Sequence, residues 1–389
     1  MSTSSQRRKY QGPAIFSKAY RPFFLGATLW AVISLILWIL MLSGTVSLPS
    51  AFSANEWHKH ELLFGYTGAV IAGFLLTAIP NWTGRLPISG LRLFILVSIW
   101  LLARIVILFS ANINPILVML IDLAFPALLS LSISIEIIAG KNWRNLRVLI
   151  VLFAFMFANL YFHLEIINKG YLQYSANLAL AIIIILIMLI GGRIIPSFTR
   201  NWLVKSKQTN LPTPFNKFDV ITMTVSIIAL LSFVFLSNQM LVAAFMLFAG
   251  LLNLIRLSRW SGIYCIKQPM IFILHIAYLF IPLGFLALAI SKIAPNLINE
   301  TGALHLFSAG AIGIMTIAMM CRVSLAHGGQ KPEADKTISL IFIAIISSVI
   351  LRFVADFFPS INFIIHISAS FWIVAFALFI IRYWRILTT

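Results

Sequence analysis

Charged residues are scarce in this chain. Asp, Glu, Lys and Arg together make up 10% of the 389 residues, whereas hydrophobic residues make up 61%. The mean hydropathy is +1.01. A water-soluble domain of this length needs a polar surface that these proportions cannot supply, so the composition excludes one. We therefore expect an integral membrane protein.

Acidic residues are the rarest charged group. The sequence has 10 Asp and Glu against 28 Lys and Arg, which gives a formal net charge of +18. Such an excess can indicate nucleic-acid binding, but here the basic residues gather in the connections between apolar segments. Basic connections mark the cytoplasmic side of a membrane, where they face anionic lipid headgroups. The charge predicts contact with the lipid bilayer and argues against nucleic acid as a partner.

Cysteine is also scarce, with only Cys265 and Cys321 in the chain. Both are expected near the cytoplasmic side, where reducing conditions disfavour a disulfide. We expect buried thiols. A small-residue cleavage site is also missing after the first apolar segment, so this segment is expected to stay in the membrane as an anchor.

Long apolar runs, by contrast, are abundant. A bilayer core of ~30 Å is crossed by about 20 apolar residues in a helix. This measure predicts an all-α, polytopic membrane protein of twelve helices. The predicted spans are residues 23–43, 62–80, 91–110, 113–139, 147–165, 175–196, 218–237, 240–257, 270–291, 304–324, 337–358 and 361–383.

The spans also define the expected organisation of the chain. An N-terminal tail of residues 1–22 precedes one twelve-helix membrane domain of residues 23–383, and a short tail of residues 384–389 follows it. The longest internal connection is expected near residues 197–217. Lys and Arg are frequent in both tails and in every even-numbered connection. Under the positive-inside rule both termini are therefore expected in the cytoplasm.

The odd-numbered, outer connections hold only Lys59, Lys169 and Lys292. Most histidines lie on this same side. Imidazole suits copper, zinc and iron, and one or two histidines can hold a heme, so the grouping predicts metal or heme binding. The outer histidines are His58, His60, His163, His305 and His366, whereas His275 and His327 lie towards the cytoplasm and could form a second site or serve structure.

Helical geometry limits how His58 and His60 could bind one metal ion. Residues i and i+2 point about 200° apart on a helix, so the pair can chelate one ion only in an extended segment. In a helix, one ring faces the bundle and the other faces elsewhere. The alternative is a wet interfacial pair beside Trp57, a common headgroup anchor. Glu61 could orient a neighbouring imidazole.

Charges inside the spans allow two interpretations. A charged group near the bilayer centre costs roughly 2.5 to 3.5 kcal/mol or more unless it is paired. Arg104 could pair with Asp122 at similar depth, and Arg352 with Asp356 at i and i+4. Otherwise Arg104 and Arg352 could neutralise anionic groups such as heme propionates.

Long motifs in this sequence resemble the NnrS family, membrane proteins described as binding heme and copper and associated with the bacterial response to nitric oxide. The resemblance covers nearly the whole chain. It departs at Lys59, where a small residue is more usual, and around His327, where Ala326 and Gly328-Gly329-Gln330 replace the usual neighbours. The motifs are Tyr20–Leu25, Trp57–Gly84, Asn142–Leu146, Asn159–His163, Gly191–Leu203, His275–Tyr278, Pro282–Gly284, Leu304–Gly313 and Met319–Gly329.

The resemblance implies heme b, copper and a place in the bacterial inner membrane. His60 and His305 stand at matched depth on the two spans richest in small residues, so we expect them as axial heme ligands, with Arg104 and Arg352 near the propionates. His58 and His163 are then the expected copper ligands.

A weaker resemblance is to the catalytic subunit of heme-copper oxidases, which also has twelve helices and heme-ligating histidines on helices two and ten. The adjacent His-His copper pair and the His-Pro-Glu-Val-Tyr motif of those enzymes are missing here, so oxygen reduction and proton pumping are disfavoured.

The expected function is resistance or response to nitric oxide, which ferrous heme binds directly. Sensing, scavenging and turnover stay open, and no enzymatic activity is assigned. The alternatives are a secondary transporter of a small solute and a cofactor-handling or assembly factor for a membrane oxidoreductase. Transporters keep ionisable groups near the midplane, whereas here they concentrate at one face.

Overall fold

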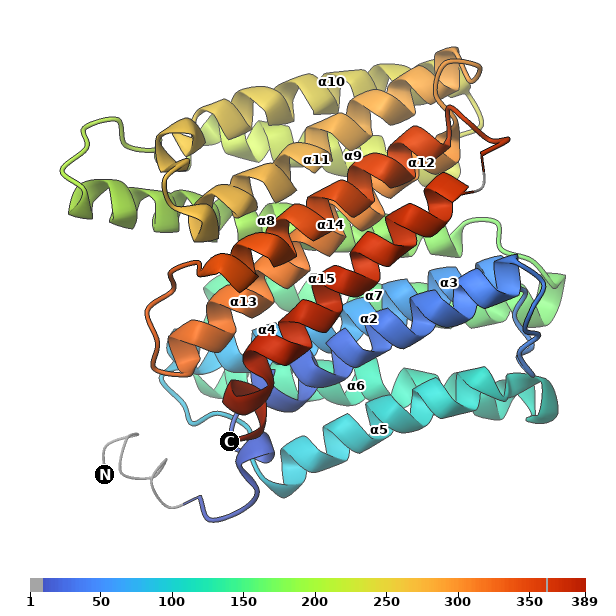
Figure 1. Cartoon of the computed structure of the whole chain (residues 1–389), viewed down its shortest axis with the longest axis horizontal. Coiled ribbons are helices and arrows are strands. Elements are labelled where there is room, and N and C mark those ends of the chain that lie inside the picture. The colour runs from blue at the N-terminus through green and yellow to red at the C-terminus, as the bar shows by residue number, and fades with distance from the viewer. Residues whose placement is uncertain (1–9, 362) are drawn as a thin grey trace. The chain divides into compact units, whose positions relative to one another are not determined.

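The computed structural model describes residues 10–361 and 363–389. These residues form helices joined by connections and contain no strand (Figure 1). Twelve helical segments of the described chain are long and apolar enough to cross a membrane, which confirms the predicted number of spans. Their bounds agree with the predicted ones to within a few residues at most ends, because long apolar runs leave little freedom in where a span lies.

The chain divides into two compact units. The first consists of Met1–Ala179, Val323–Gln330 and Phe379–Thr389, and the second of Leu180–Arg322 and Lys331–Leu378. Three long helices cross from one unit to the other along the chain, namely α8 (Ser175–Lys205), α13 (Met315–His327) and α15 (Phe363–Thr388).

One span forms the core of the first unit. In an apolar stretch of 18 residues within the continuous segment Ala54–Thr83, 83% of the residues are buried, whereas the corresponding share in the remaining spans up to Lys169 is 33% to 39%. Its helix α4 packs against α2 and α6, and α6 packs against α5 and α7. The helices of this unit are α2 (Tyr20–Leu42), α3 (Ala54–His60), α4 (Thr67–Thr83), α5 (Leu91–Leu108), α6 (Pro115–Ala139) and α7 (Leu146–Lys169).

This central span begins earlier than predicted, at Ala54 instead of residue 62. Ser53 and Glu56 form a capping box, in which each side chain accepts a hydrogen bond from the other residue's backbone N–H. Such a box starts a helix even where the following residues are polar. His58 and His60 therefore lie within the helix.

Two spans change their winding directly after a histidine. A π-helical stretch, Glu61–Tyr66, follows His60 in the first unit, and another, Leu306–Ile314, follows His305 in the second. π-Helical turns are rare in proteins as a whole, but those that occur often lie at functional sites. The wider turn displaces side chains from the face that they would have in an α-helix.

The second unit repeats the arrangement of buried and outer spans. In the corresponding apolar stretches of 18 residues, 72% of the residues are buried in Pro269–Ile293 and 78% in Glu300–His327, whereas 39% are buried in Gln239–Ser258. Helix α11 packs against α10, α12 and the second π stretch, which also packs against α14. The further helices are α9 (Lys217–Phe235), α10 (Gln239–Ser258), α11 (Pro269–Ile293), α12 (Glu300–His305) and α14 (Lys336–Ala355).

Helix α8 continues beyond the predicted end of its span at residue 196. Thr199 and Leu203 are fully buried, and Leu203 packs with Cys265 and Ile271. This packing holds the helix to Lys205, so the connection to α9 is residues 206–216. Cys265 and Cys321 are both buried and are not joined in a disulfide, as predicted, and burial raises the pKa of the Cys265 thiol.

Small residues permit close approach in the two spans that contain the π-helical stretches. A Cβ atom at Gly73 would lie 2.7 Å from the ring of Phe24, and one at Gly310 would lie 2.7 Å from the ring of Phe280. Both glycines therefore admit an aromatic ring against the backbone.

Candidate metal centre

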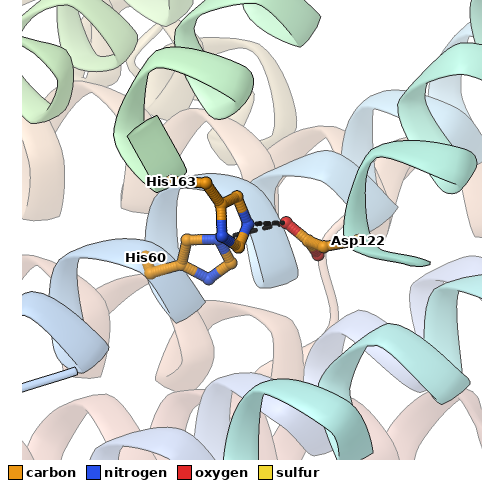
Figure 2. Close-up of side chains that lie close together, drawn as sticks. All are labelled: His60, Asp122 and His163. Atoms are coloured by element: carbon orange, nitrogen blue, oxygen red, sulfur yellow. Dashed lines mark hydrogen bonds and ion pairs between the residues drawn. The ribbon is translucent and has the colours of Figure 1, made fainter. Parts of the chain in front are cut away.

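Three buried side chains from different helices of the first unit meet at one point. They are His60 at the end of α3, Asp122 on α6 and His163 on α7. Each offers one ligand atom, and these atoms lie within 4.8 Å of one another. Figure 2 shows both imidazoles turned towards the carboxylate of Asp122. The exposed fractions are 0%, 1% and 2%, so the site is closed to water.

Asp122 is the centre of the cluster. Its Oδ2 lies 3.1 Å from Nε2 of His60 and 3.1 Å from Nε2 of His163. The same oxygen accepts a hydrogen bond of 2.7 Å from Nδ2 of Asn159. Its other oxygen, Oδ1, accepts from Nη2 of Arg104. Four side chains thus converge on one carboxylate.

A second carboxylate orients His60 from the opposite side of the ring. Oε1 of Glu61 lies 2.9 Å from Nδ1 of His60 and accepts a hydrogen bond of 2.6 Å from Nη1 of Arg104. Its Oε2 accepts a hydrogen bond of 2.6 Å from Nε1 of Trp30. This contact is the type that fixes the ring orientation of a metal-binding histidine. Glu61 has the orienting position predicted for it.

The π turn brings this network against the backbone. A Cβ atom at Gly65 would lie 2.8 Å from Nη1 of Arg104, 2.9 Å from Oε2 of Glu61 and 3.0 Å from Nε1 of Trp30. The backbone oxygen of Gly65 accepts a hydrogen bond of 2.9 Å from Nε1 of Trp100. A glycine in the first turn after the histidine therefore makes room for the ion pair.

Aromatic rings surround the imidazole of His60. The ring centroids of Phe52, Phe64 and Phe162 lie 5.2, 5.2 and 5.1 Å from its centroid. These rings exclude water, and in a site of low dielectric the charge interactions are stronger than at a surface.

The charges of the cluster balance only with one further positive charge. Asp122 and Glu61 carry two negative charges, and Arg104 carries one positive charge. Both ring nitrogens of His60 face carboxylate oxygens, so a doubly protonated His60 donates at both and makes the cluster neutral. A metal cation at the same place would serve equally. Leaving one buried charge uncompensated would cost several kcal/mol.

The arrangement has the chemistry of a small metal site with two imidazoles and one carboxylate. Ions such as copper or zinc bind these ligands at about 2.0 to 2.2 Å, which puts tetrahedral ligand atoms roughly 3.3 to 3.6 Å apart. The two nitrogen to oxygen distances of 3.1 Å are already close to that separation.

The ion pairs proposed from depth and spacing are confirmed. Arg104 is paired with Asp122, and Nη1 of Arg352 donates to Oδ1 of Asp356 over 2.9 Å in the second unit. The two pairs differ in surroundings, since Arg104 is buried and Arg352 is half-buried.

His58 lies away from the cluster. Its ring stacks on Trp38, with centroids 4.3 Å apart, because a helix turns i and i+2 to different faces. The adjacent Trp57 is fully buried with its ring 6.4 Å from that of Trp30, so it is not an interfacial anchor.

The remaining candidate histidines lie in separate surroundings. In the second unit, Nδ1 of His305 lies 2.7 Å from the backbone oxygen of Thr301, and Nε2 of His275 lies 2.8 Å from Oγ1 of Thr199. In the first unit, the backbone oxygen of His327 accepts a hydrogen bond from Lys18. His366 is half-buried on α15.

Asp122 of the cluster, and Asn159 that donates to it, were not predicted as part of a metal site. Asp122 was expected only as an ion-pair partner, and Asn159 was known only from a motif. A signal for Asn159 is its spacing of four residues before His163, which places both on one helix face. Asp122 lies on another helix, so spacing along the chain cannot connect it with either histidine.

Comparison with protein-family models gives one match, described as NnrS protein, over residues 14–389. Comparison with curated proteins gives no match. The family match spans nearly the whole chain and, at the level of the family, supports a membrane protein of the nitric oxide response. The chain belongs to the NnrS family.

Proposed function

We propose that this protein acts in bacterial resistance or response to nitric oxide through a copper ion bound by His60, Asp122 and His163. The observation that carries the proposal is the convergence of three buried ligand atoms within 4.8 Å. Two imidazoles and a carboxylate suit copper, zinc or iron.

The charge balance favours a monovalent ion. Cuprous ion would replace the one positive charge that a doubly protonated His60 supplies, so the buried cluster would stay neutral. A divalent ion would leave one excess positive charge in a closed site, where it would require an additional anion. Copper bound here would supply one-electron redox chemistry.

The protein's own residues have defined tasks in this proposal. Glu61 holds Nδ1 of His60 and so leaves its Nε2 for the ion. Arg104 pairs with both Glu61 and Asp122 and compensates one of their two negative charges. Asn159 holds the Asp122 oxygen that faces both histidines.

Heme b is the second cofactor that the family resemblance implies. Both ring nitrogens of His60 face side-chain oxygens and three aromatic rings enclose it, which favours a single ion over a macrocycle there. His305 suits iron better, since a metal-bound imidazole often directs its other nitrogen at a backbone carbonyl, as His305 does towards Thr301. Heme held through His305, with Arg352 near its propionates, is the form of the heme assignment that we propose.

The test is the metal content of purified full-length protein. Wild-type protein should contain about one copper per chain, and His163→Ala and Asp122→Asn should lose it. His58→Ala is the matched control, because it removes an imidazole from the same helix turn but outside the cluster. A reduced-minus-oxidised spectrum of His305→Ala reports heme separately from copper.

The outcomes separate the assignments. Copper lost in His163→Ala and kept in His58→Ala supports the cluster. Equal loss in both would favour the sequence-based ligand pair His58 and His163. Copper kept in His163→Ala and Asp122→Asn would refute the centre. Cells carrying His163→Ala should also be as sensitive to a nitric oxide donor as cells without the protein.

A further inference from the structure

A cavity of about 390 Å³ lies in the first unit, at the opposite end of α4 from the metal centre. Thr77, Pro80 and Asn81 of α4 line it, 17 or more residues beyond His60. At 1.5 Å per residue this is a separation of about 25 Å along the helix. The cavity is therefore a separate site. Its volume lies within the range of small-molecule sites.

One wall of the cavity is held in place by contacts between distant parts of the chain. The segment before α2 closes one side, where the backbone oxygen of Phe16 accepts a hydrogen bond of 2.9 Å from the N–H of Gly90. The ring of Phe16 packs edge-on against Phe94, with centroids 5.3 Å apart. Nζ of Lys18 donates to the backbone oxygen of His327 over 2.7 Å. Three contacts between distant parts of the chain thus hold the wall.

The end of α15 completes this region, and Figure 1 shows it beside the start of α2. All residues that line the cavity belong to the first unit. The distribution of Lys and Arg assigns this end of the unit to the cytoplasm.

The lining is positively charged. Lys18 and Arg21 line the cavity, and none of the described side chains that line it is Asp or Glu. Nε of Arg21 is buried and has no acceptor among the described residues, while its Nη1 donates to the backbone oxygen of Ala14 over 2.9 Å. A buried N–H donor without an acceptor calls for a missing partner, such as an anion or water.

Residues with neutral donors also line the cavity. The amide of Asn81 and the hydroxyl of Ser89 line the cavity. The apolar remainder of the lining includes Leu76 and Pro87. Cationic and amide donors beside apolar surface suit a ligand with a charged head and an organic body.

We propose that this cavity binds a phosphate-bearing anion, with Arg21 and Lys18 as its charge partners. A guanidinium presents donors that match phosphate oxygens, and an ammonium adds a point charge. Two cations match a phosphate group better than a single carboxylate. The phosphate could come from an anionic lipid headgroup of the cytoplasmic leaflet or from a soluble phosphorylated compound, and both share this chemistry.

The experiment uses full-length protein in an uncharged detergent. Binding of inorganic phosphate is measured by thermal unfolding, and retention of phosphatidylglycerol against phosphate-free diacylglycerol is measured by native mass spectrometry. Arg21→Gln should weaken phosphate binding about tenfold or more, because a hydrogen bond to a charged group is lost. Arg147→Gln is the matched control, because Arg147 is exposed and is not among the lining residues, and it should bind as wild type.

A second variant tests the same site in case Arg21→Gln does not fold. Ser89→Asp leaves both cations in place and adds a carboxylate to the wall, so it should abolish binding while the protein keeps its metal content. Retention of phosphatidylglycerol with weak inorganic phosphate binding identifies a lipid ligand, and the reverse identifies a soluble one. If wild-type protein binds neither probe, or if Arg21→Gln and Ser89→Asp bind both as Arg147→Gln does, the proposal is wrong.

Discussion

The ion pair between Arg104 and Asp122 provides a direct test of how the candidate metal centre is held together. Both side chains are buried, with exposed fractions of 2% and 1%, and Arg104 also pairs with Glu61 over 2.6 Å. Replacing Arg104 by Leu leaves two carboxylates in a closed site. Removing one partner of a buried pair costs about 3 to 5 kcal/mol, so we expect Arg104→Leu to lose about that much stability.

The double-mutant cycle isolates the pair. Asp122→Leu should also destabilise, but the double variant should cost less than the sum of the two by about 1 to 3 kcal/mol, since neither charge is then left alone. Unfolding in detergent by a chemical denaturant measures all four proteins. The chain supplies a matched control in Arg85 and Glu136, which are also 2.6 Å apart, but there the Arg85 side chain is 44% exposed.

Water screens the exposed control pair of Arg85 and Glu136, so the coupling free energy from its double-mutant cycle should be below about 1 kcal/mol. Additive effects in the Arg104 and Asp122 cycle, or equal coupling in the two cycles, would refute the view that burial makes this pair structural.

Three further predictions concern single positions and topology. Gly65→Ala would bring a methyl group to 2.8 Å from a guanidinium nitrogen, so it should destabilise the protein by about 1 to 3 kcal/mol, and a wild-type unfolding midpoint would contradict this. Glu165→Ala removes the acceptor of three backbone N–H groups at the start of α8 and should cost about 2 kcal/mol or more, measured by unfolding in detergent. Reporters after Thr389 and near Lys207 should show cytoplasm and one near Asn55 the periplasm, and a cytoplasmic signal at Asn55 would overturn the proposed orientation.

The spans were predictable because hydropathy alone defines them. The chief exception at a span start is Ala54–His60, which is helical yet polar, so a hydropathy window begins only at residue 62. Its capping box, Ser53 with Glu56, is visible in the sequence and marks the true start. The helical residues after Pro196 were not predicted for the same reason, since burial of Leu203 keeps a polar stretch helical.

The candidate site was predictable only in part. His60 and His163 could be grouped by depth, since topology assigns each residue a height in the membrane. The sequence does not predict how each helix is rotated about its own axis. Lipid is as apolar as the protein core, so the hydrophobic pattern of a span does not distinguish its buried face from its lipid-facing face. His58 was therefore grouped with His60, although its ring lies against Trp38.

Titration of purified, metal-free protein with cuprous ion tests the central claim most directly. One ion should bind per chain. Because the ion would displace the proton that the charge balance places on His60, about one proton should be released per ion. Affinity should therefore rise with pH, since fewer protons then compete for the nitrogen. His163→Ala should abolish the tight site. Tight binding by His163→Ala, or binding by wild-type protein without proton release, would contradict a copper centre at His60, Asp122 and His163.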